Sequence, residues 1–268
     1  MRFKIHLNRT GRNNLLPINY QYELSSWIYK TLHFGNPEFS EWLHSEGYLI
    51  GKKQFKLFTF SHLNFPDKGY TILKEKERLR VNSPNCHFYI SMMMSDAAQN
   101  FILGLFKNQR FGLGDKQSLV DFEVGTIERI ADPEFENTAQ FRAISPIFVS
   151  KGGGLLPSGK LRQIYLGPED EGYKHLLLEN LTNKWLAIQK IKGFGAEQMD
   201  FSQFEFNLLS KPRTKLIKIK ADTAAQTKLK GYLYDFELKA PKQLIEIAYN
   251  TGIGGLGSQG FGCLGEIK

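Results

Sequence analysis

The apolar positions of this chain change between two periods, which predicts a mixed protein of helices and strands. Residues 2–8, RFKIHLN, alternate apolar and polar side chains as a half-buried strand does, with Phe3, Ile5 and Leu7 on one face. From Tyr20 to Leu32 the apolar residues recur at helical spacing. The remaining pattern of the first half predicts a helix at 36–47, strands at 55–61, 77–82 and 86–94, a helix at 96–107 and a strand at 118–130.

The second half has a similar order of elements. The pattern predicts a strand at 138–151, a helix that opens at Gly167 and Pro168, strands at 214–220 and 228–238, a helix that begins at Pro241 and a last strand at 261–268. Both halves therefore read β-α-β-β-α-β, the order of ferredoxin-like and RNA-recognition folds. We predict the α+β class with two tandem ferredoxin-like (RRM-like) domains, residues 1–132 and 138–268. Element order alone carries this duplication, because the halves share no sequence repeat.

The composition predicts a polyanionic partner and a reducing compartment. The 268 residues carry a formal net charge of +8, which favours a polyanionic partner such as nucleic acid. Only Cys86 and Cys263 are present, so no disulfide framework is predicted, and we expect a reducing, cytoplasmic setting. No apolar run has the length of a membrane span, and the charged, alternating N-terminus is unlike a signal peptide. We therefore expect no membrane association.

The stretch TGIGGLGSQGFG, residues 251–262, poses the main chemical question of the sequence. Gly252, Gly254 and Gly257 spell G-x-G-x-x-G, but a helix precedes them and a strand follows, the reverse of a dinucleotide-binding site. A second near-match, GLLPSGKL at 154–161, has Leu161 where a P-loop needs Ser or Thr for magnesium. What remains is a helix-to-strand loop whose exposed N–H groups can lie against a sugar-phosphate chain. A plain flexible surface loop is the alternative.

Several segments resemble one family in the same order along nearly the whole chain. GIGGLGSQGFGCLG strongly resembles the glycine-rich loop of the CRISPR-associated repeat-processing endoribonucleases of the RAMP superfamily. The segments MRFKIHL, YELSSWIYKTLHFGNPEFSEWLHSEG, KLFTFS and ISPIFV resemble four other parts of these proteins. The resemblance implies two ferredoxin-like domains and an enzyme that cuts the repeats of a CRISPR transcript to release guide crRNAs. It also implies no metal and no cofactor, with precursor and mature crRNA as the bound partners.

The resemblance further implies a catalytic set of His44, Tyr29 and Lys56. Metal-free RNA cleavage by the 2′-hydroxyl needs one proton removed from the nucleophile and one given to the departing 5′-oxygen, and a histidine can serve either step. The predicted helix end at His44 suits a general acid. Lys56 would offset charge on the phosphorane, and Tyr29 would hold a phosphate oxygen or orient the nucleophile. His33, one turn beyond Tyr29, is the rival histidine, and ordinary surface or packing roles stay open for all four residues.

The expected RNA-binding residues combine the glycine-rich loop with basic side chains. They are Gly252, Gly254, Gly255, Gly257, Ser258, Gln259, Gly260, Lys52, Lys53, Arg213, Lys218, Lys220 and Lys230. A solvated basic face is the alternative for the lysines. No Cys or His lies at zinc-ligand spacing, so no metal site is predicted. The alternative function is a non-catalytic repeat-RNA-binding subunit of a CRISPR effector complex, and other effector subunits or a homodimer stay open as further partners.

Overall fold

The structure is a computed structural model that describes residues 1–66, 68–155, 161–193, 199–220 and 226–267. Its first unit is built on one antiparallel sheet with the strand order β5-β8-β1-β10-β9. The strands are β1 (Arg2–Arg9), β5 (Phe58–Phe60), β8 (Asn85–Met92), β9 (Arg110–Gly114) and β10 (Leu119–Ile130). The order β5-β8-β1-β10 is the 2-3-1-4 order of a ferredoxin-like fold, and β9 adds an edge strand that the sequence did not predict.

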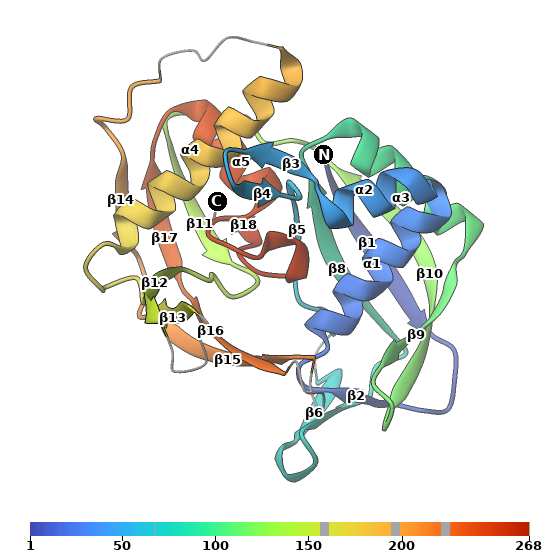
Figure 1. Ribbon diagram of the computed structural model, residues 1–268. Helices are drawn as coiled ribbons and strands as arrows, with labels where there is room; N and C mark the ends of the chain where they lie inside the picture. Colours follow the sequence, from blue (N-terminus) through green and yellow to red (C-terminus); the bar gives the residue numbers. More distant parts are fainter. Residues whose placement is uncertain (67, 156–160, 194–198, 221–225, 268) are drawn as a thin grey trace.

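Three helices cover the first sheet on the side drawn toward the viewer in Figure 1. They are α1 (Gln21–Gly35), α2 (Pro37–Ser45) and α3 (Ser95–Lys107). Trp27 of α1 anchors this layer, because its ring stacks on Phe111 at 4.0 Å between centroids and meets Phe88 edge-on at 6.0 Å. Ile5 and Leu7 of β1 are fully buried on the same face, as their alternation predicts.

The second unit repeats the plan with the antiparallel order β14-β17-β11-β18. Its elements are β11 (Thr138–Ala143), α4 (Tyr173–Lys192), β14 (Glu205–Leu208), β17 (Asp235–Lys239), α5 (Lys242–Thr251) and β18 (Leu264–Glu266). The two tandem ferredoxin-like units are thus confirmed. Their division at residues 132–138 stays a prediction.

Two middle strands of the second unit were wrongly assigned from the sequence. The strongly alternating segments at 214–220 and 228–238 were expected in the main sheet. Most of that sequence instead forms a separate hairpin of β15 (Arg213–Ile219) and β16 (Thr227–Leu233). The sheet takes β14, which has only four residues and half-buried side chains, so its apolar pattern is too short to recognise. The predicted strand at 228–238 divides between β16 and β17.

Smaller sheets decorate both units. They are the three-stranded sheet of β2 (Leu15–Pro17), β6 (Tyr70–Leu73) and β7 (Arg78–Val81), the hairpin of β3 (Tyr48–Ile50) and β4 (Lys53–Phe55), and the hairpin of β12 (Ser150–Leu155) and β13 (Leu161–Tyr165), with 3₁₀ turns η1 (Lys74–Lys76) and η2 (Gly257–Gln259). The β3–β4 hairpin reaches from the first unit to α4 of the second (Figure 1). No helix in the described ranges has both the length and the apolar character needed to cross a membrane.

The two units lie side by side and share one buried core. Arg2, which is only 3% exposed, fastens this seam. Its guanidinium donates to Ser91 Oγ at 2.6 Å in the first unit, and to the carbonyls of Leu264 at 2.7 Å and Tyr249 at 3.0 Å in the second. It also lies 3.6 Å from the centroid of the Tyr249 ring. One cation on β1 therefore satisfies buried acceptors on both units.

We predict that Arg2→Met lowers the free energy of unfolding by about 2–4 kcal/mol, because two buried carbonyls lose a charged donor. Chemical denaturation monitored by circular dichroism measures the change. Arg129→Met is the matched control, since Arg129 is 65% exposed and its pair with Asp132 lies at the surface. Equal stability of the two variants would contradict the role given to Arg2.

Candidate active site

Helix α2 places His44 at the edge of the first unit. The helix begins as its sequence predicts, with the Asn36 side chain accepting a hydrogen bond from the Phe39 N–H at 3.0 Å and Pro37 in the first turn. It ends at Ser45, and Gly47 follows with φ +63°. His44 therefore lies in the last turn with an exposed side chain that a substrate can reach.

Tyr29, His44 and Lys56 come together at this helix end. The rings of Tyr29 and His44 meet edge-on with centroids 5.1 Å apart. Lys56, in the segment between β4 and β5, donates from Nζ to the carbonyl oxygen of His44 at 2.8 Å. Three segments that are separate in the sequence thus bring a phenol, an imidazole and an ammonium group to one place, which is suited to proton transfer and charge stabilisation.

The ionisation of Tyr29 and Lys56 reflects their surroundings. Burial raises the pKa of Tyr29 to about 12, so its hydroxyl is a proton-bearing donor at neutral pH. Partial burial lowers the pKa of Lys56 from its ordinary value, because desolvation disfavours the ammonium form. His33 is exposed in the last turn of α1. Within the described chain it forms no ring contact or hydrogen bond with the other three residues.

The glycine-rich loop of the second unit borders this cluster. Ser258, in η2, lies beside the Tyr29 phenol and opposes the effect of burial on the pKa of that group. Its carbonyl oxygen accepts from Ser25 Oγ of α1 at 2.7 Å. Thr59 Oγ1 of β5 donates to the Phe261 carbonyl at 2.9 Å. The loop is therefore fixed to the helix that carries Tyr29 and to the strand that follows Lys56.

Most of the loop glycines are explained by contacts within the protein. Gly252, Gly254 and Gly260 have φ between +78° and +84°, where other residues are strained. A Cβ at Gly257 would lie 2.8 Å from the Phe58 carbonyl oxygen, and one at Gly260 would lie 2.6 Å from the Phe60 ring. Gly255 differs, since its φ is not positive and its nearest Cβ neighbour would be Phe148 at 3.3 Å.

Lys184 of α4 is hydrogen-bonded to the same loop. It is 5% exposed, and its Nζ donates to the carbonyls of Gly252 at 2.7 Å and Gly254 at 3.3 Å. Burial lowers its pKa to about 7. Sequence reasoning missed this residue, although it occupies an apolar-stripe position, three residues after Leu181 and seven after Leu177.

Both halves of the chain match models of one protein family. Residues 130–265 match the family described as CRISPR associated protein Cas6, C-terminal, and residues 15–124 match CRISPR-associated protein Cas6, N-terminal. The chain belongs to the Cas6 family. This confirms the resemblance found in the sequence.

Relatives match this Cas6 chain over nearly their whole length. The CRISPR-associated endoribonuclease Cas6 1 of Methanocaldococcus jannaschii is 28% identical, with 100% of this chain and 93% of the relative covered. A solved structure of a Cas6-related gene product from Pyrococcus furiosus is 25% identical, with a TM-score of 0.80 and 100% and 98% of the two chains covered. A structure described as an RAMP protein binding different RNA substrates has the same fold, with a TM-score of 0.80, 24% identity and both chains fully covered.

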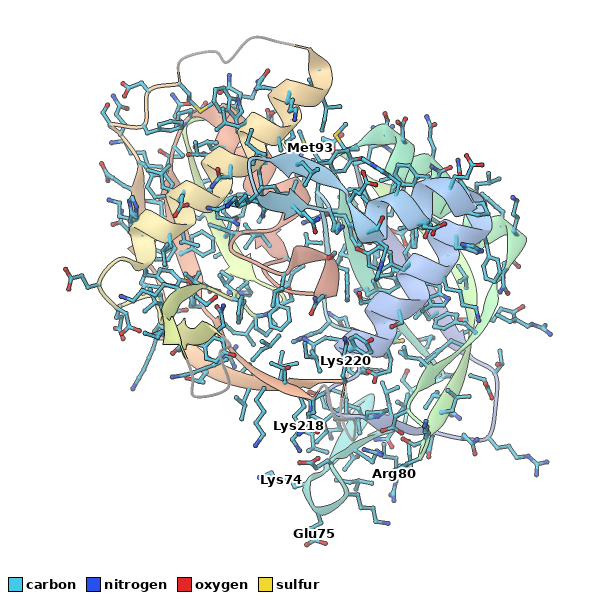
Figure 2. The ribbon with its side chains drawn as sticks, in the orientation of Figure 1. Lys74, Glu75, Arg80, Met93, Lys218 and Lys220 are labelled. Carbon is cyan, nitrogen blue, oxygen red and sulfur yellow. The ribbon has the colours of Figure 1, made fainter. Side chains whose placement is uncertain are left out.

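Of the basic residues expected to bind RNA in this Cas6 protein, Lys53 and Lys218 form ion pairs between the two units. Lys53 pairs with Glu179 of α4, and Lys218 Nζ lies 2.6 Å from Glu77 in the first unit, near Lys74 and Arg80 (Figure 2). The other four expected cations are Lys52 in the turn after β3, Arg213 at the start of β15, Lys220 just after β15 and Lys230, whose Nζ lies 5.3 Å from the Tyr232 ring centroid. Their RNA-binding roles stay predictions.

The described residues hold no group of three or more His, Cys, Asp or Glu side chains arranged to bind a metal ion.

Ser25, Thr59 and Lys184 are the site-supporting residues that sequence reasoning missed. Ser25 and Thr59 give no sequence signal, because Ser and Thr are mostly exposed in proteins and nothing in the sequence marks these two as buried.

We predict that Gly260→Ala and Gly255→Ala differ sharply in stability. The first substitution meets both a positive φ and the Phe60 ring, so it should cost about 2–3 kcal/mol of unfolding free energy. The second should cost less than about 1 kcal/mol. Thermal and chemical denaturation of the two variants test this, and equal costs would show that the loop is not constrained as described.

We also predict that Lys184 makes stability rise with pH. Folded Lys184 loses its proton near pH 7, whereas in the unfolded chain it does so near its ordinary value of 10.5. Between these values the unfolded state binds more protons, so unfolding free energy rises with pH, by up to ~1.4 kcal/mol per unit. The measurement is chemical denaturation of the wild type and Lys184→Met from about pH 6 to about pH 10.

The free energy of unfolding of the wild type, relative to that of Lys184→Met, should increase with pH over this range. Lys190→Met, which removes an exposed lysine from the same helix, should run parallel to the wild type. A Lys184→Met curve parallel to the wild-type curve would contradict the buried, partly neutral lysine.

Proposed function

We propose that this Cas6 protein is an endoribonuclease that binds CRISPR repeat RNA and cuts the precursor transcript into guide crRNAs. The observation that carries the proposal is the convergence of Tyr29, His44 and Lys56 beside the glycine-rich loop. Family membership and the endoribonuclease name of the Methanocaldococcus relative support the substrate and the reaction class.

The proposed reaction is an internal transesterification of the RNA. The 2′-hydroxyl oxygen attacks the neighbouring phosphorus, the bond from phosphorus to the 5′-oxygen breaks, and the products carry a 2′,3′-cyclic phosphate and a 5′-hydroxyl. One proton passes from the 2′-hydroxyl to water, and His44 donates one to the departing 5′-oxygen. These demands are proton transfer and neutralisation of the phosphorane charge, which side chains can supply without a metal ion.

Each residue of the cluster has a role that fits its position. His44 is exposed, so its imidazole can reach the scissile bond and protonate the 5′-oxygen. Lys56 brings a positive charge to the phosphorane, and Tyr29 offers a protonated phenol to a phosphate oxygen. The hydrogen bond from Ser25 to the Ser258 carbonyl holds helix α1, which carries the phenol, against the loop.

The two domains divide the work in this proposal. Residues 1–132 carry the catalytic side chains, and residues 138–268 supply the glycine-rich loop and the basic β15–β16 hairpin. Lys52, Arg213 and Lys230 bind phosphates along the RNA path. Lys53 and Lys218 contribute once phosphate competes with Glu179 and Glu77, since exposed ion pairs of this kind are weak.

The test is cleavage of end-labelled repeat RNA in EDTA. The wild type should cut at one position and leave the two end groups named above. His44→Ala should slow cutting by about 10²–10⁴-fold, because a general acid is lost, while RNA binding is retained. His33→Ala should cut at close to the wild-type rate.

Two outcomes would change the proposal. Normal cutting by His44→Ala with loss in His33→Ala would move the catalytic role to His33. Binding without any cutting by the wild type would favour a repeat-binding subunit of an effector complex.

A further inference from the structure

A pocket of about 300 Å³ lies beside the catalytic cluster, between β4, α4 and the glycine-rich loop. We propose that it receives one unstacked base of the RNA, as a specificity site that rests on the proposed function. Its walls include Phe55, Phe148, Asn180, Asn183, Gly254 and Gly255. Its volume is at the lower end of the range of small-ligand pockets, about 300–1,000 Å³, which suits a single base.

The pocket is next to the site of the proposed chemistry. Phe55, at the end of β4, directly precedes Lys56 in the chain. The β3–β4 hairpin pairs Tyr48 with Phe55 and is tied to α4 by the Lys53–Glu179 ion pair at the pocket. The pocket wall is therefore continuous in the chain with the segment that carries Lys56, and we expect the bound base to belong to a nucleotide near the scissile phosphate.

The lining is aromatic and amide-rich, which matches a base better than a phosphate. Phe55 is half-buried, and an aromatic face of this kind stacks on unpaired bases in RNA-binding proteins. Asn180 Oδ1 is buried and has no hydrogen-bond partner among the described groups. Lys53 and Glu179 also line the pocket, and because they form an ion pair, the lining carries no net charge to attract a phosphate. An uncharged base with donors and acceptors on its edge needs no such attraction.

Gly255 supplies an independent reason to place a ligand here. Gly252, Gly254, Gly257 and Gly260 are each required by a positive φ or by a sub-3 Å contact within the protein. Gly255 has neither requirement, yet it lines the pocket. A Cβ at Gly255 would lie 3.3 Å from the Phe148 ring, so its absence leaves room beside an aromatic wall of the pocket for a ligand to approach the backbone.

The experiment is an abasic scan of the repeat RNA. Each RNA carries one abasic nucleotide, and a 2′-deoxy substitution at the mapped cut site prevents cleavage. In the wild type, one position near the cut should weaken binding by about 5- to 150-fold, the range of one base–aromatic stack. In Phe55→Ala that position should cost nothing further, and every other position should respond as in the wild type.

Three further variants make the result specific. Phe55→Tyr should restore the response, because it keeps the aromatic face. Phe106→Ala, which removes a phenylalanine that is 67% exposed on α3, should match the wild type at every position. Asn180→Ala, whose lost oxygen has no partner to leave unpaired, should abolish discrimination among the four bases at the same position.

Parallel abasic profiles for Phe55→Ala and the wild type would overturn the base pocket, as would unchanged base discrimination in Asn180→Ala. Cutting of repeat RNA would survive that result, and the proposed function with it. A wild type that binds no repeat RNA would overturn both.

Discussion

The seating of the glycine-rich loop between the two units is the constraint on which the site depends. Lys184 draws the carbonyls of Gly252 and Gly254 toward α4, and Thr59 holds Phe261 against β5. Close approach of this kind needs positive φ and missing Cβ atoms, which explains the glycine density by the fold itself. The conformational entropy lost in ordering the glycines is offset by these buried hydrogen bonds and by the shared core.

This seating joins the second unit to the proposed catalytic residues of the first. Ser258 lies beside Tyr29, and its carbonyl oxygen accepts a hydrogen bond from Ser25 on the same helix. Tyr29 in turn lies against His44, whose backbone holds Lys56. Contacts across the domain seam therefore link the proposed catalytic groups to the loop, and neither unit alone contains all of them. Such preorganisation is what catalysis by positioned donors and charges requires.

The sequence was sufficient for the features that local pattern determines. The Asn36–Pro37 start of α2, the burial of Ile5 and Leu7, and the βαββαβ order all follow from capping, alternation and period. Strand partners are set by tertiary pairing, so the regular β15–β16 hairpin was mistaken for the sheet strands that β14 and β17 provide. The family resemblance, not the periodicity, brought Tyr29, His44 and Lys56 into one set.

Only part of the positive charge of the chain is free to bind RNA, because several basic side chains already have partners within the protein. Arg2 and the partly neutral Lys184 are buried and donate to carbonyls at the seam, so they stabilise the fold and offer nothing to a phosphate. Lys53 and Lys218 are already paired with carboxylates across the two units. A phosphate that displaced Glu179 or Glu77 would release a contact between the units as it bound. In the proposed function, Lys53 and Lys218 therefore serve both RNA binding and contact between the units, so the net charge of +8 is not a measure of RNA affinity.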